Sequence, residues 1–73
     1  MPKHPTFKAR VVTAALEKAG FYRVRQKGSH LQMKRGNLLV TIPQHPGDLS
    51  PEVFRSILRQ ARMTLDEFLQ YHR

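Results

Sequence analysis

The fold is decided by residues 21–42, whose sequence is FYRVRQKGSHLQMKRGNLLVTI. Two short segments, Gly28-Ser29 and Arg35-Gly36-Asn37, divide this stretch into three parts, and glycine within such segments favours tight turns. Between the turns, polar and apolar residues alternate or β-branched residues gather, which is typical of strands. Because turns this short join antiparallel neighbours, we predict a meander of three strands at residues 21–25, 30–34 and 38–42.

A helix is predicted before the meander, over residues 7–19. Its apolar residues fall on one arc at a spacing of 3.6 residues: Val11, Val12, Ala15, Leu16 and Ala19. Thr6 is a candidate N-cap for this helix, and Gly20 stands where a glycine commonly ends one.

A second helix is predicted after the meander. Residues 43–49 form a loop, and Ser50-Pro51 then supplies an N-cap followed by a proline in the first helical turn. The apolar arc of this helix contains Val53, Phe54, Ile57, Leu58 and Ala61. Thr64 and Glu67 have the spacing of a capping box, which predicts a short last helix through Leu69.

These elements predict a single α+β domain over residues 1–73, with flexible ends at 1–6 and 71–73. Helices before and after an antiparallel sheet can share one of its faces. We expect the strand residues that face the helices to be Tyr22, Val24, Leu31, Met33, Val40 and Ile42, with Phe21 only partly buried. The opposite face would then carry Arg23, Arg25, His30, Gln32, Lys34 and Thr41.

The charge of the chain indicates an anionic partner. Lysine and arginine total 13 against 5 acidic residues, giving a net charge of +8, and no acid occurs between Glu17 and Asp48. Such an excess favours nucleic acid, anionic lipid or an acidic protein, although a basic surface also serves solubility alone. A histidine within a basic, acid-free segment suits chemistry on a polyanion, and RNA is the polyanion that a histidine can cut.

Composition also limits the other function classes. The chain has no cysteine, so disulfides and thiolate metal sites are excluded, and its four histidines are scattered. We therefore expect neither a metal nor a cofactor. No apolar run approaches the roughly 20 residues of a membrane-spanning helix, and no signal-peptide pattern is seen at the start. The expected location is the cytoplasm.

Four stretches of the sequence resemble the HicA toxin family: Gly20-Phe21, 25–30 (Arg-Gln-Lys-Gly-Ser-His), 41–45 (Thr-Ile-Pro-Gln-His) and 57–61 (Ile-Leu-Arg-Gln-Ala). The resemblance covers about residues 8–69, and Gly-Ser-His is its most specific part. It implies a fold similar to double-stranded-RNA-binding domains and a ribonuclease that cuts messenger RNA, with action on the ribosome a further possibility. It also implies a HicB-type antitoxin as partner.

The chain departs from the family pattern at two places in the second long helix. Members often have a Gly-Thr-Leu-like segment where this chain has Glu52-Val53-Phe54, and a glycine where it has Arg62. Both departures lie away from Gly-Ser-His. They bear on antitoxin docking and on the end of the helix more than on the chemistry.

The resemblance assigns the catalytic role to His30. The interpretation is a metal-independent transesterification in which His30 takes the proton of a ribose 2′-hydroxyl, because imidazole exchanges protons near neutral pH. Cations would stabilise the phosphorane. The residues expected to bind RNA are Arg23, Arg25, Lys27, Gly28, Ser29, Lys34 and Arg35.

Several interpretations stay open at this point. His45 is a candidate acid for the leaving 5′-oxygen, and equally a loop residue or an antitoxin contact, whereas His4 and His72 are expected to have no specific role. The basic stripe Arg55, Arg59 and Arg62 is either a solvated helix face or a contact to phosphate or antitoxin. The alternatives to a nuclease are a non-catalytic RNA-binding module and a protein-interaction domain.

Overall fold

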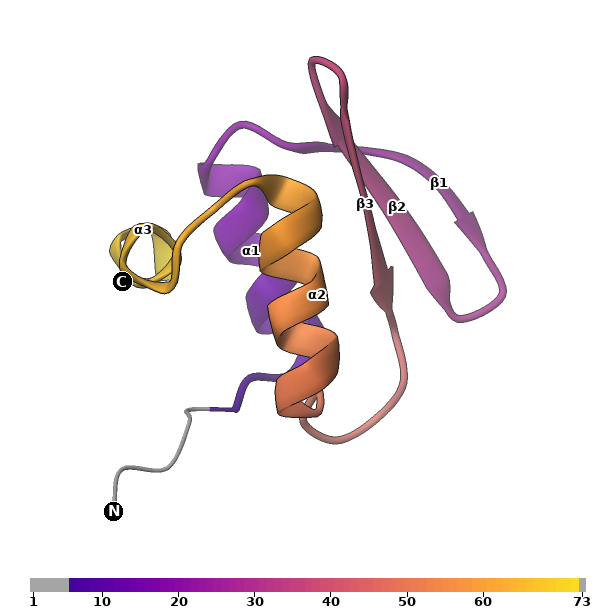
Figure 1. Cartoon of the computed structure of the whole chain (residues 1–73). Coiled ribbons are helices and arrows are strands. Elements are labelled where there is room, and N and C mark those ends of the chain that lie inside the picture. Colours follow the sequence, from indigo (N-terminus) through magenta and orange to yellow (C-terminus); the bar gives the residue numbers. More distant parts are fainter. Residues whose placement is uncertain (1–5, 73) are drawn as a thin grey trace.

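The computed structural model describes residues 6–72, and within them it confirms the predicted α+β architecture (Figure 1). The elements in chain order are α1 (Ala9–Lys18), β1 (Tyr22–Lys27), β2 (His30–Arg35), β3 (Leu38–Pro43), α2 (Pro51–Ala61) and α3 (Leu65–His72). The strands form one antiparallel sheet in the order β1-β2-β3. The tail at residues 1–5, which includes His4, lies outside the described residues, and so does Arg73.

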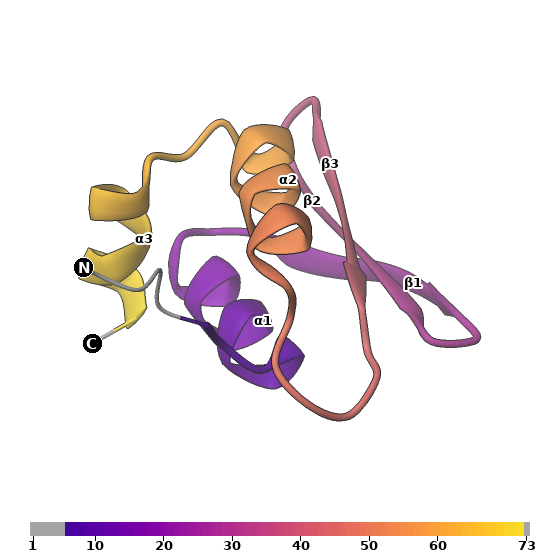
Figure 2. The same ribbon diagram turned by 60° about the horizontal axis from the view of Figure 1, so that its bottom comes forward.

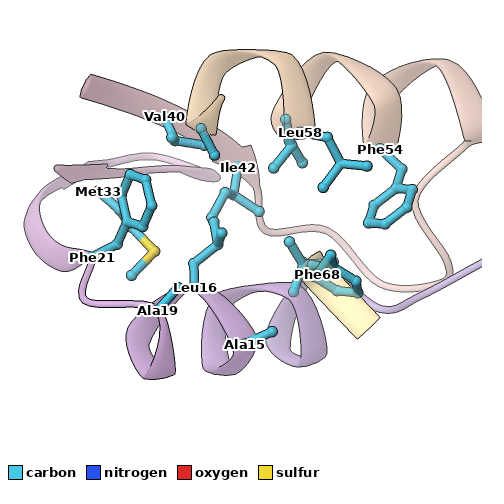
Figure 3. Close-up of a cluster of buried hydrophobic side chains, with 14 of the residues drawn as sticks. Ala15, Leu16, Ala19, Phe21, Met33, Val40, Ile42, Phe54, Leu58 and Phe68 are labelled. Atoms are coloured by element: carbon cyan, nitrogen blue, oxygen red, sulfur yellow. The ribbon is translucent and has the colours of Figure 1, made fainter. Parts of the chain in front are cut away.

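The helices α1 and α2 cover the same face of the sheet, while α3 packs against α1 on the side away from the strands (Figure 2). This arrangement leaves the second face of the sheet without a helix. The core lies between the helices and the covered face, where Leu16, Met33 and Ile42 are fully buried (Figure 3). Phe68 is the buried anchor of α3. The predicted inward direction of Leu31, Met33, Val40 and Ile42 is confirmed.

Both long helices end in the same hydrogen-bonded pattern, a Schellman motif. In α1, the Phe21 N–H donates to the Leu16 carbonyl at 2.9 Å and the Gly20 N–H to the Glu17 carbonyl at 3.0 Å. The motif needs a left-handed residue, and Gly20, with a φ of +103°, meets that need as predicted. In α2, the same position is held by Arg62, with a φ of +53°.

The first helix starts later than predicted, at Ala9 rather than Phe7, and Thr6 is not its N-cap. Lys8 forms a β-bridge with Asp48, and the Leu49 N–H donates to the Phe7 carbonyl at 2.9 Å. The Thr6 hydroxyl donates to the Asp48 carboxylate. These contacts to a distant loop hold residues 6–8 extended, so the helix can begin only after them.

The expected burial of the first strand is wrong by one residue. Phe21 is 2% exposed and belongs to the core, whereas Tyr22 and Val24 are 54% and 44% exposed. The Schellman motif turns the chain so that Phe21 packs back against α1. The inward-facing position is therefore taken by Phe21, one residue before β1 begins. A register shift between Arg23 and Arg25 then breaks the strict alternation on which the prediction depended.

The last helix begins as predicted and ends later. The capping box is present, because the Glu67 N–H donates to the Thr64 hydroxyl at 3.1 Å and the Thr64 N–H donates to the Glu67 carboxylate at 2.9 Å. The helix continues to His72, past the expected end at Leu69 and into the segment expected to be flexible. His72 has a packing role that was not expected, with its ring 4.8 Å from that of Phe7 and stacked on Phe68.

Candidate functional site

The face of the sheet that carries no helix is hereafter called the open face, and its residues follow from the strand register. Residues directly opposite each other on neighbouring strands point to the same side. One row across the sheet is Lys27, His30 and Pro43, the next is Arg25, Gln32 and Thr41, and the third is Tyr22, Lys34 and Leu39. The predicted positions of Arg25, His30, Gln32, Lys34 and Thr41 on this face are therefore confirmed.

A hollow of about 450 Å³ lies on the open face around His30. Its lining residues are Arg25, Lys27, His30, Gln32 and Thr41. His30 and both cations are exposed to solvent, and none of the lining residues is acidic. The hollow thus combines a titratable base with two positive charges and polar hydrogen-bonding groups, and it is accessible to a large anionic ligand.

The turn between β1 and β2 fixes the position of His30. Lys27 and His30 pair across it, so Gly28 and Ser29 form a two-residue loop. Such loops need a left-handed first residue, and Gly28 has a φ of +58°. The Gln26 side chain donates to the Gly28 carbonyl at 3.3 Å, which braces the loop.

Gln44 connects this turn to the helical layer. Its backbone N–H donates to the Ser29 carbonyl, one residue before His30. Its side-chain amide donates to the hydroxyl of the buried Thr13 in α1, at 3.3 Å, and to the Ile42 carbonyl, at 3.4 Å. The backbone around His30 is therefore attached to the core through Gln44, although the imidazole itself is exposed.

Gln60 supports the opposite wall of the hollow. Its side-chain oxygen accepts a hydrogen bond from the Thr41 N–H at 2.9 Å, and its amide nitrogen donates to the Ser56 hydroxyl at 3.1 Å. This contact ties β3 to α2 and satisfies a backbone donor at the outer edge of the sheet. The backbone of β3 is thereby fixed at Thr41, whose side chain lines the hollow.

Of the seven residues expected to bind RNA, only Arg25 and Lys27 line the hollow. Gly28 and Ser29 form the adjacent turn, and Lys34 lies on the open face outside the lining, whereas Arg23 and Arg35 are directed elsewhere. Arg23 is opposite the buried Met33, on the helix-covered side of the sheet, and forms an ion pair with Glu17 at 3.4 Å. Its predicted place on the open face is wrong. Arg35 donates to the Ala19 carbonyl at the end of α1, at 2.7 Å, and its guanidinium lies 4.8 Å from the centre of the Phe21 ring. The guanidinium of Arg35 is thus engaged in holding α1 against the sheet.

His45 is not among the residues that line the hollow around His30. It lines a separate hollow of about 400 Å³ beside the start of α1, with Lys8, Arg10 and Gln44 among its neighbours. The stripe of Arg55, Arg59 and Arg62 is exposed along α2, as its spacing predicted. It lies on the helix layer and contributes nothing to the lining of the hollow around His30.

The chain was also compared with known protein families. The family model for the "HicA toxin of bacterial toxin-antitoxin" matches residues 9–63. The chain belongs to the HicA toxin family. The match covers α1, the whole sheet and α2, whereas α3 lies beyond it. A search of curated proteins found no match.

Membership in the HicA family makes the chain the toxin part of a toxin-antitoxin pair, so an antitoxin is its expected partner. Between residues 6 and 72, no helix is long and apolar enough to cross a membrane. In the same part of the chain, the acidic residues and histidines form no group of three that could hold a metal ion.

Sequence reasoning missed the supporting roles of Gln44 and Gln60. Both residues occur in the stretches that carry the family resemblance, but their side chains act on segments 31 and 19 residues away in the chain. Gln44 directly follows the Pro43 that pairs with His30, which was the one available signal. A single glutamine forms no periodic pattern in the sequence, so its hydrogen-bond partner can be identified only in the folded structure.

Proposed function

We propose that this HicA toxin is an endoribonuclease that cuts messenger RNA, with His30 as the general base. The observation that carries the proposal is the hollow in which His30 lies beside Arg25 and Lys27 on an exposed, acid-free surface. A base that works on RNA must reach the ribose while positive groups hold the adjacent phosphate. The accessible position of His30 between strands β1 and β3 suits both requirements.

The reaction uses the 2′-hydroxyl of the substrate as its nucleophile. His30 accepts the hydroxyl proton, and the 2′-oxygen forms a bond to the neighbouring phosphorus. The bond from phosphorus to the 5′-oxygen then breaks, leaving a 2′,3′-cyclic phosphate on one product and a 5′-hydroxyl on the other. Because the nucleophile belongs to the substrate, the reaction needs neither a bound water nor a metal to generate one.

Arg25 and Lys27 have a distinct role in this proposal. The pentacoordinate phosphorane carries more negative charge than the phosphodiester from which it forms, so fixed cations stabilise it more than the substrate. Arg25 stands two residues before Lys27 on β1, and both flank His30 across the strand pair. Gly28 and Ser29 would let the backbone approach the same phosphate.

We assign the proton of the leaving 5′-oxygen to solvent rather than to His45. His45 lines a different hollow from His30, whereas His30 is itself open to water. The variant His45→Ala is therefore expected to keep the pH–rate profile of the wild type. Loss of the basic limb of that profile in His45→Ala would restore His45 as the acid.

The expected antitoxin is of the HicB type, and we propose that it inhibits by covering the open face. An acidic protein complements the positive charges of Arg25, Lys27 and Lys34, and the same contact would hide His30. The proposed place of action is the cytoplasm, where both messenger RNA and ribosomes are found.

The test is incubation of labelled messenger RNA with the wild type and with His30→Ala, in EDTA, followed by mapping of the RNA ends. Cleavage by the wild type alone, with cyclic phosphate ends, is the expected result. His45→Ala is a matched control, because it removes an imidazole from a neighbouring loop. Cleavage by His30→Ala at the wild-type rate would refute the role of His30. RNA binding without cleavage by any variant would instead favour a non-catalytic RNA-binding module.

A further inference from the structure

The end of the open face farthest from His30 carries two large exposed apolar side chains that have no partner within the described chain. The row there consists of Tyr22 on β1, Lys34 on β2 and Leu39 on β3. Tyr22 is 54% exposed and Leu39 is 48% exposed, although both are large apolar side chains. An aromatic ring and a leucine side chain are thus exposed to solvent on either side of a lysine.

We propose that one unpaired base of the RNA stacks on the ring of Tyr22, while Lys34, its neighbour in the row, holds a phosphate and Leu39 adds apolar surface on the far side of Lys34. The inference depends on the proposed ribonuclease function, because it assigns a second contact to the same substrate. It adds the substrate class: the RNA must be single-stranded at this position, since a base inside a duplex is stacked between its neighbours and has no free face.

Charge on the open face favours RNA over an apolar protein partner. Arg25, Lys27 and Lys34 all belong to this face, and residues 22–43, which form the three strands, contain no aspartate or glutamate. Aromatic rings interleaved with cations are the usual means of holding single-stranded nucleic acid, because the cations follow the backbone and the rings take the bases. A purely apolar partner would have to desolvate these three charges without pairing them.

The spacing along β2 fits one RNA strand that contacts both ends of the face. His30 and Lys34 are separated by four residues of β2, or about 13 Å at roughly 3.3 Å per residue. An extended RNA strand covers that distance within a few nucleotides. The base on Tyr22 therefore flanks the cleaved bond without being part of it, so Tyr22 would contribute to substrate affinity and base preference.

The first experiment measures affinity for a fluorescein-labelled random single-stranded RNA in the uncleaving His30→Ala background. Adding Tyr22→Ala should weaken binding by about 5- to 150-fold, the range that loss of one aromatic stack produces. Tyr22→Phe should restore most of the affinity, because the ring is kept. Tyr71→Ala is the matched control, since Tyr71 is 37% exposed on α3, away from the sheet.

The second experiment finds the stacked base. An RNA centred on a mapped cleavage site is made with one abasic nucleotide, which is moved one position at a time. At one position the abasic RNA should bind the His30→Ala protein more weakly, and Tyr22→Ala should add no further loss there. If every position is equally affected by Tyr22→Ala, the stacking proposal is wrong.

Failure of this inference can be separated from failure of the proposed function. If the wild type cuts RNA and Tyr22→Ala leaves RNA affinity unchanged, the stacking proposal is refuted while the nuclease stands, and a protein becomes the better candidate for the row. If no variant binds RNA and the wild type cuts none, both proposals are refuted together.

Discussion

Replacing Arg62 with glycine should stabilise the protein. Both α1 and α2 end at a left-handed position, but α1 has a glycine there and α2 has Arg62. Both helices end in a Schellman motif, with the Met63 N–H donating to the Leu58 carbonyl at 2.9 Å in α2. In α1, the left-handed position is Gly20, which has no Cβ to clash there. In α2, Arg62 holds φ and ψ of 53° and 47° and is exposed to solvent.

The size of the effect follows from two opposing terms. A residue with a Cβ pays roughly 1–2 kcal/mol to stay in the left-handed region. Glycine avoids that cost, but it also has more conformational freedom in the unfolded chain. This freedom lowers the free energy of unfolding by about 0.5–1 kcal/mol. Since the exposed Arg62 side chain buries little surface, Arg62→Gly should raise the free energy of unfolding by about 0.5–1 kcal/mol.

Urea denaturation of the wild type, Arg62→Gly and Arg62→Ala measures this directly. The alanine variant removes the same charge and side chain but keeps the Cβ, so it controls for the lowered net charge. Arg62→Gly should be more stable than Arg62→Ala by about 1 kcal/mol, which is roughly a fivefold change in the folding equilibrium. Equal stability of the two variants would show that the left-handed geometry carries no cost here.

Three further predictions concern packing, the sheet edge and acid. Phe68→Ala should cost about 3–5 kcal/mol, since the ring is fully buried; a loss below about 1 kcal/mol in urea denaturation would mean that α3 is not docked. Gln60→Leu should cost about 1–2 kcal/mol and speed amide hydrogen exchange at Thr41, while unchanged exchange would contradict the hydrogen bond between them. Hydrogen bonds from the backbone and then the hydroxyl of Thr64 lower the pKa of Glu67. Its contribution is therefore present above the unfolded pKa and lost as pH falls through the folded pKa, so Glu67→Gln should lower Tm at pH 7 and less so in acid; a constant Tm difference would refute this.

The parts of the fold that were predicted correctly are those encoded by neighbours in sequence. The turn at Gly28 places Lys27 opposite His30, and alternation along β2 then separates Leu31 and Met33 from His30 and Gln32. A strand has a period of two, so one correct turn determines the face of every residue in the hairpin arm that follows. The central feature of the site, His30 on the face without helices, was predictable for this reason.

The errors arose where residues distant in sequence meet. Arg23 has a strand pattern that places it on the open face, but the shift in register and the ion pair with Glu17 turn it to the other side. Arg35 is basic like its neighbours, yet its nearest acceptor is the Ala19 carbonyl at the exposed end of α1. Nothing in the local sequence distinguishes a cation that caps a helix from one that meets a phosphate.

Because the core and the site are separate, substitutions in the site can be tested for their effect on activity without a large effect on stability. In a domain of 73 residues, a total stability of about 4–11 kcal/mol leaves little margin for losses in the core. The side chains of Arg25, Lys27 and His30 are exposed and contribute nothing to the buried cluster behind the sheet. Their substitution should therefore change RNA cleavage while the free energy of unfolding stays within about 0.5 kcal/mol of the wild type.

The backbone of the same hairpin is held by Gln44 through Thr13, so loss of activity on replacing Gln44 would come with a measurable loss of stability. Comparing the two kinds of variant distinguishes residues that perform the chemistry from a residue that positions them.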